Sequence, residues 1–154
     1  MGSRKGFFCF HENMLNIISK IGSFFLKKGR KNIGFFGEDE AVVFLKKKQY
    51  TLLERNIRNK YGYSLGEIDV IAKKGKQLVF FEVKTRVCRD EDPLPPEMSI
   101  TKQKIRKLEK IIFQYRISHA QYKKWPFRLD AVIIVYDKNN KVKYIQHKEN
   151  IFLD

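Results

Sequence analysis

Hydrophobic and polar positions after about residue 33 follow two different periods, which divide the chain into helices and strands. Apolar residues recur at helical spacing in 37–48 and again after Ser99 or Thr101, either of which can cap that second helix. β-Branched and aromatic runs predict strands, and the longest of them is continuous enough for a buried central strand. This order predicts an α/β fold with a central mixed β-sheet flanked by helices. The expected strands are 50–59, 66–72, 78–86, 127–136 and 141–146.

The second and third strands are separated by Lys73-Lys74-Gly75-Lys76, which is the sequence signal of a hairpin. With Gly75-Lys76 as a two-residue turn, Asp69 lies opposite Glu82. Glu67 then lies opposite Lys84, and the four side chains share one face of the sheet. A turn centred on Lys74-Gly75 would shift the partners by two residues and keep them on one face, whereas a three-residue loop would separate them.

Glu82 is the unusual residue of this hairpin. It lies in Leu78-Val79-Phe80-Phe81-Glu82-Val83, which is apolar on both faces and therefore typical of a strand covered on both sides. An unpaired buried charge costs several kcal/mol, so a cation must lie beside it. Lys84 alone can form a cross-strand ion pair, but three acids on the face leave negative charge over. A hard divalent cation such as Mg²⁺ is the alternative partner.

The formal net charge of +15, from 32 basic and 17 acidic residues, favours a polyanionic partner. Nucleic acid is the first expectation and an anionic membrane surface the second, while a highly charged soluble domain remains the simplest alternative. Cys9 and Cys88 are far apart, and the three histidines also lack metal-ligand spacing. The sequence therefore indicates neither a zinc site nor a disulfide framework.

Residues 1–33 form a basic amphipathic extension, and 34–154 the expected globular domain. Apolar residues recur at helical spacing within 14–25, with five lysines and arginines around and after them. The apolar run is too short to cross a bilayer and does not resemble a cleaved signal peptide, so we expect a cytoplasmic protein. This segment could pack on the domain, extend from it loosely, or approach a membrane or nucleic acid through residues 14–31.

Asp69 followed by Glu82-Val83-Lys84 resembles the D…(D/E)-x-K signature of the PD-(D/E)XK, or restriction-endonuclease-like, nuclease superfamily. More closely, the chain is similar between Gly37 and Phe152 to the YraN-like family of predicted bacterial endonucleases. Ile68 stands where the superfamily name has Pro, and the loop 60–65 is longer than the resemblance leads us to expect. The matching blocks are Gly37-Glu38-Asp39-Glu40-Ala41, Glu54-Arg55-Asn56, Gly66-Glu67-Ile68-Asp69, Val79 to Arg86, and Phe127-Arg128-Leu129-Asp130.

The resemblance implies a restriction-endonuclease-like core and a metal-dependent endonuclease acting on DNA. Asp69 and Glu82, with Glu38, would hold Mg²⁺ or Mn²⁺, and Lys84 would orient the attacking water or offset phosphate charge. Glu67 would be a supporting acid. Alternatively, Glu38 has only a structural role, because an acidic side chain near a helix N-terminus interacts favourably with the helix dipole. The rival function is a nucleic-acid-binding module with little or no hydrolysis. RNA is not excluded as a substrate, and a homodimer would most easily cut both strands.

Basic residues on the second helix are candidates for phosphate contacts, although such a run is also typical of a solvated face. The resemblance places Lys104 beside the metal as a phosphate-holding cation. For Arg128 and Asp130 the preferred interpretation is a structural ion pair. The candidate nucleic-acid-binding residues are Lys104, Lys102, Arg106, Lys107, Arg86 and Tyr61, the last in a loop where aromatic rings could stack on bases.

Overall fold

The computed structural model describes residues 33–58, 66–88 and 100–152. The chain divides into two units, Met1–Ile33 and Gly34–Asp154, and the architecture below is that of the second. The amphipathic extension and Tyr61 lie outside the described residues. Among the described helices, none is long and apolar enough to span a membrane.

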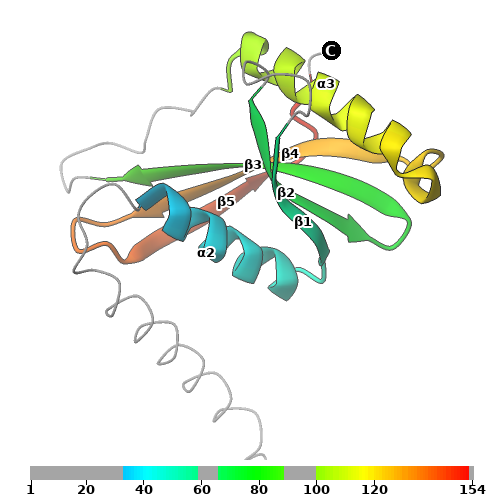
Figure 1. Ribbon diagram of the computed structural model, residues 1–154. Coiled ribbons are helices and arrows are strands. Elements are labelled where there is room, and N and C mark those ends of the chain that lie inside the picture. The colour runs from blue at the N-terminus through cyan, green and yellow to red at the C-terminus, as the bar shows by residue number, and fades with distance from the viewer. Residues whose placement is uncertain (1–32, 59–65, 89–99, 153–154) are drawn as a thin grey trace, which may run out of the picture. The chain divides into compact units, whose positions relative to one another are not determined.

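The described chain confirms an α/β fold built on a mixed five-stranded sheet in the order β1-β2-β3-β4-β5. Neighbouring strands are antiparallel except for β3 and β4, which run parallel and are connected through α3 (Figure 1). The elements are α2 (Ile33–Lys47), β1 (Thr51–Arg58), β2 (Glu67–Lys74), β3 (Gln77–Val87), α3 (Lys102–Ser118), the 3₁₀ turn η2 (Ala120–Tyr122), β4 (Phe127–Tyr136) and β5 (Val142–Lys148).

The hairpin β2–β3 has the predicted two-residue turn. Pairing runs from Lys74 with Gln77 to Val70 with Phe81, and Gly75 takes a positive φ of 58°. Glycine tolerates this conformation because it has no Cβ. Asp69 and Glu82 are the next residues on the two strands beyond the last of these pairs.

Helices α2 and α3 cover opposite faces of the sheet (Figure 1). The apolar stripe of α3 packs against Phe80 and Leu129 in the main hydrophobic cluster. On the other face Phe44 of α2 meets the ring of His147 at 6.3 Å, and His147 lies 5.7 Å from Phe81. Each helix therefore buries an apolar stripe, as their periodicity predicts.

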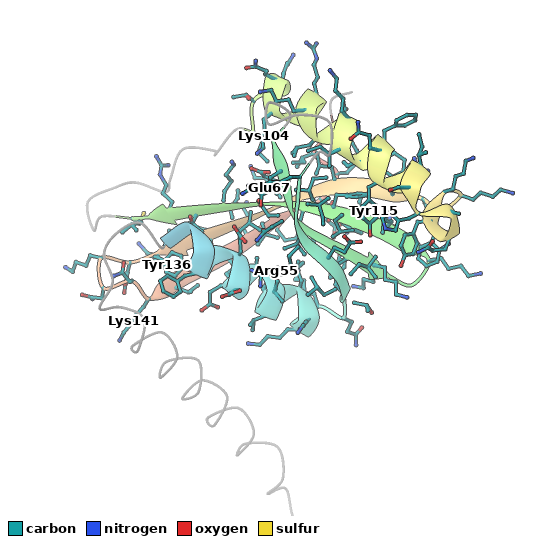
Figure 2. All side chains as sticks on the ribbon, in the orientation of Figure 1. Arg55, Glu67, Lys104, Tyr115, Tyr136 and Lys141 are labelled. Carbon is teal, nitrogen blue, oxygen red and sulfur yellow. The ribbon has the colours of Figure 1, made fainter. Side chains whose placement is uncertain are left out.

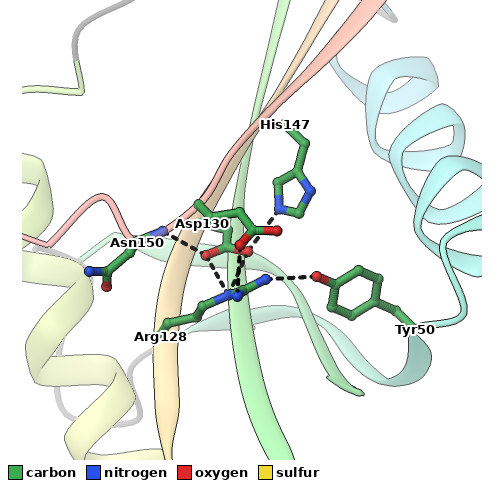
Figure 3. Close-up of polar contacts among 6 residues, drawn as sticks. Tyr50, Arg128, Asp130, His147 and Asn150 are labelled. Atoms are coloured by element: carbon green, nitrogen blue, oxygen red, sulfur yellow. Dashed lines mark hydrogen bonds and ion pairs between the residues drawn. The ribbon is translucent and has the colours of Figure 1, made fainter. Parts of the chain in front are cut away.

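A buried polar network ties β4 to β5 and to the start of β1 (Figure 3). Asp130 is fully buried and accepts hydrogen bonds from the Arg128 guanidinium at 3.0 Å and the Asn150 backbone N–H at 3.0 Å. His147 Nε2 lies 2.8 Å from the same carboxylate, and Arg128 donates to the Tyr50 hydroxyl at 2.8 Å. The structural ion pair expected for Arg128 and Asp130 is confirmed.

Two local predictions are wrong. Helix α2 begins at Ile33, not at Gly37, because glycines are tolerated within its first turns. Simple alternation along β1 predicts that Arg55 and Ile57 share a face, but Arg55 turns to the acids of α2 while Ile57 packs into the α3 cluster. Asn56 between them has a positive φ of 54°, which breaks the two-residue period.

Candidate active site

Glu82 lies in the middle of β3 with a side chain only 3% exposed, and two lysines compensate its charge. Lys84 Nζ lies 2.6 Å from Oε1, and Lys104 Nζ from α3 lies 3.3 Å from Oε2. A buried carboxylate is tolerated where cations neutralise it. Among the described residues Oε2 nevertheless accepts no hydrogen bond, so one buried carboxylate oxygen still has a free lone pair.

Asp69 approaches the same place from β2. Its Oδ2 accepts the backbone N–H of Val83 at 2.6 Å. Burial raises the pKa of Asp69 from 3.8 to about 7, and the negative charge of Glu82 adds to the effect. The Val83 hydrogen bond and the Lys104 charge oppose this rise. A cation beside Asp69 would therefore stabilise its ionised form. We call Asp69, Glu82, Lys84 and Lys104 the acid–lysine cluster.

Helix α2 brings a third acid toward the acid–lysine cluster. At Gly37 the helix lies directly on β3, where an added Cβ would be only 1.8 Å from Thr85 Cγ2. The next residue is Glu38, whose charge contributes to the raised pKa of Asp69. Its Oε2 lies 3.5 Å from Arg55 NH2, and the same guanidinium donates to Asp39 Oδ1 at 2.7 Å.

Arg55 is a site residue that sequence reasoning did not single out. It stands in the Glu54-Arg55-Asn56 block, but the irregular alternation of β1 concealed that its side chain reaches α2. Glu67 also differs from expectation. Instead of pairing with Lys84, it forms an ion pair with Arg58 of the neighbouring strand β1 at 2.8 Å.

A metal ion would find few oxygen ligands in the arrangement described. No group of three or more His, Cys, Asp or Glu side chains in residues 33–58, 66–88 and 100–152 could hold one as it stands. Mg²⁺, however, commonly uses one or two carboxylates and keeps several waters. Asp69 and Oε2 of Glu82, which has an ion pair with Lys104 but accepts no hydrogen bond within the described part of the chain, fit such a site, while Glu38 would have to leave Arg55 to join it.

The candidate nucleic-acid-binding residues differ in how far they are buried and in whether they reach the acid–lysine cluster. Lys104 lies in the acid–lysine cluster, and Figure 2 labels it near the start of α3. Lys102 and Arg106 are exposed, and Arg86 is exposed near the end of β3, so none of these three has its side chain buried at the cluster. Lys107 is partly buried. The basic helix therefore offers one lysine to the carboxylates and an exposed ridge to solvent.

Comparison with known proteins gives consistent results over this domain. A profile of the Uncharacterised protein family UPF0102 matches residues 37–134. A UPF0102 protein of Caldicellulosiruptor saccharolyticus is 38% identical over 123 residues, which is 80% of this chain and 98% of the relative. A UPF0102 protein of Dictyoglomus thermophilum is 38% identical over 122 residues, 79% of this chain and 98% of the relative.

The profile match begins at Gly37 and includes Glu38, Arg55 and the whole acid–lysine cluster. It leaves residues 1–36 outside. The profile therefore covers most of the stretch from Gly37 to Phe152 over which the chain is similar to the YraN-like family. This chain belongs to the UPF0102 family.

Proposed function

We propose that this protein is a metal-dependent endonuclease that hydrolyses phosphodiester bonds of DNA, built on a restriction-endonuclease-like core. The observation that carries the proposal is the acid–lysine cluster: a buried Glu82 next to Asp69, with two lysines in reach. Structural ion pairs need no second acid of raised pKa beside them. An acid whose pKa is raised by burial and by a neighbouring carboxylate is instead typical of functional sites.

In this proposal Asp69 and Glu82 hold Mg²⁺, which would lower the pKa of a bound water and polarise the scissile phosphate. Glu82 fixes the Lys84 ammonium through its 2.6 Å contact, while the lysine side chain remains 33% exposed. Lys84 can therefore donate to a water or phosphate oxygen that approaches from solvent. Lys104 is 31% exposed and offsets the charge of the same phosphate from the side of α3.

A nucleic-acid-binding module without hydrolysis is the second candidate. It is favoured by the two lysines that already neutralise Glu82 in the arrangement described, so that the carboxylate needs no metal for charge balance. Such a module would bind DNA with an affinity that falls steeply with salt, because neutralised phosphates release counterions. Addition of Mg²⁺ would yield no cleavage product.

The test is incubation of purified protein with labelled single-stranded, duplex, flap and four-way-junction DNA and with RNA, in Mg²⁺, Mn²⁺ or EDTA. We expect metal-dependent products that disappear in Asp69→Asn and Lys84→Ala. The matched controls are Asp137→Asn in the β4–β5 turn and Lys143→Ala at an exposed position of β5, which should both cut normally. Cleavage by both Asp69 and Lys84 variants would refute this site, and binding without cleavage under all conditions would favour the second candidate.

A further inference from the structure

Aromatic rings gather where α3 ends and η2 begins. His119 stacks on Tyr115 with ring centroids 4.0 Å apart and an interplanar angle of 24°. The His119 ring also lies 6.3 Å from the Tyr122 ring at an interplanar angle of 28°, and Tyr122 meets Trp125 edge-on at 5.2 Å. His119, Tyr122 and Trp125 are only partly buried, so this ladder of rings borders solvent.

Hydrogen bonds hold the inner end of the ladder in place. The Tyr115 hydroxyl donates to Glu54 Oε1 at 2.7 Å, and His119 Nδ1 lies 2.8 Å from the Tyr115 carbonyl oxygen. His119 Nε2 also lies 3.5 Å from the same Glu54 oxygen. Because these contacts already fix the Tyr115 and His119 rings, the protein loses little further side-chain entropy at this end of the ladder when a ligand binds.

Lysines surround the ladder. Lys73 Nζ lies 6.0 Å from the centroid of the Trp125 ring, and Lys123 and Lys124 are exposed beside it. The hairpin turn is fixed next to Trp125 because Leu78 N–H donates to the Pro126 carbonyl at 2.9 Å. Figure 2 shows nitrogen-tipped side chains projecting from this end of the molecule. We call His119, Tyr122, Trp125, Lys73, Lys123 and Lys124 the aromatic–basic patch.

We propose that the aromatic–basic patch binds a single-stranded nucleic acid segment, with bases on its rings and phosphates on its lysines. Rings interleaved with cations are the combination that single strands require, because every base has a stacking face and every nucleotide a charge. A protein of net charge +15 adds long-range attraction to such a polyanion. A duplex offers its bases for stacking only at its ends.

The position of the patch connects it to the proposed nuclease, and this part of the inference rests on the proposed function. Lys104 and His119 lie near opposite ends of α3, about 22 Å apart along the helix axis at 1.5 Å for each residue. A stacked strand spans that distance in about six or seven nucleotides. The patch would therefore favour substrates with a single-stranded arm of at least that length beside the scissile bond.

Trp125 is the single tryptophan of the chain, so its fluorescence reports directly on the patch. In EDTA, which prevents metal-dependent cleavage, we expect oligo(dT) or oligo(rU) to quench this fluorescence saturably. The oligonucleotide that quenches at the lower concentration shows whether the patch prefers DNA or RNA. A blunt hairpin duplex and dextran sulfate, which carries charge without bases, should quench far less. Equal quenching by dextran sulfate, or none by either oligonucleotide, would overturn the proposal.

Variants give a second measurement by anisotropy of a labelled oligonucleotide. Trp125→Ala should weaken single-strand binding roughly tenfold, the typical loss of one stacked base. Phe113→Ala is the matched control, because it removes a ring that is 63% exposed on α3 but lies outside the patch. Equal affinities of the two variants would refute the patch. Single-strand binding without cleavage would instead refute the nuclease and leave the patch standing.

Discussion

Gly37 offers the sharpest test of how α2 is positioned over the sheet. The substitution Gly37→Ala would place a Cβ 1.8 Å from Thr85 Cγ2, whereas ordinary contacts begin near 3.4 Å. The helix must therefore move by more than 1 Å or the threonine must change rotamer. Because Glu38 follows directly, any movement of the helix also shifts the third acid relative to Asp69.

Two effects of opposite sign decide the outcome. Alanine is a better helix former than glycine by about 1 kcal/mol, which favours the variant. Overpacking of a close contact typically costs about 1–3 kcal/mol, and here the overlap is deep. We therefore expect Gly37→Ala to lower the free energy of unfolding by about 1–2 kcal/mol.

The double variant Gly37→Ala/Thr85→Ser is the control. Serine lacks Cγ2, and the nearest atom to the new methyl group becomes the Cβ of residue 85 at 3.3 Å, which small shifts accommodate. Urea denaturation of the four proteins in a double-mutant cycle should give a favourable coupling of roughly 2 kcal/mol. A neutral or stabilised Gly37→Ala, or a coupling near zero, would show that α2 does not lie on β3 through this residue.

Two further changes test the buried acids. Because burial raises the pKa of Asp69 to about 7, the protonated form of Asp69 makes a contribution to stability that is fully present below pH 3.8. This contribution, up to about 4 kcal/mol, is lost as the pH rises to about 7. Asp69→Asn lacks this ionisation, so in EDTA its stability relative to wild type should rise between about pH 4 and pH 7, and a constant difference would refute the raised pKa. Asp130→Asn should lower the free energy of unfolding by about 3–5 kcal/mol, since it leaves Arg128 partly unpaired. Tyr50→Phe removes one hydrogen bond and should lower it by only about 1 kcal/mol. Equal losses in urea titrations would contradict the network.

The sequence predicted the sheet better than it predicted the surroundings of the acids. Alternation and the Gly75-Lys76 turn determine the register of β2 and β3, because a one-residue slip would move Phe80 from the face under α3 to the opposite face. The same reasoning correctly identified Glu82 as a buried acid that needs a cation. Thr101 was correctly proposed as a cap, and it accepts the Lys104 N–H at 3.2 Å.

Contacts between distant segments could not be predicted in the same way. Arg55 reaches Glu38 and Asp39 because β1 is irregular on both sides of it, with a register shift between Leu52 and Glu54 and a positive φ at Asn56, and no local pattern marks these breaks. The direction of Glu67 toward Arg58 likewise depends on the β1–β2 pairing. Periodicity assigns a residue to a face, but it does not choose which of several charges on that face becomes its partner.

The strand order has a consequence for how the acid–lysine cluster is assembled during folding. Strands β2 and β3 are neighbours in the sheet and joined by a two-residue turn, so Asp69 and Glu82 meet through local contacts that close quickly. Lys104 arrives only when α3 packs on the sheet, after the longer connection between Val87 and Lys102. Loop closure of that length is slower. The carboxylates therefore come together before one of the cations that compensates them, and the mutual repulsion of the acids is relieved only late in folding.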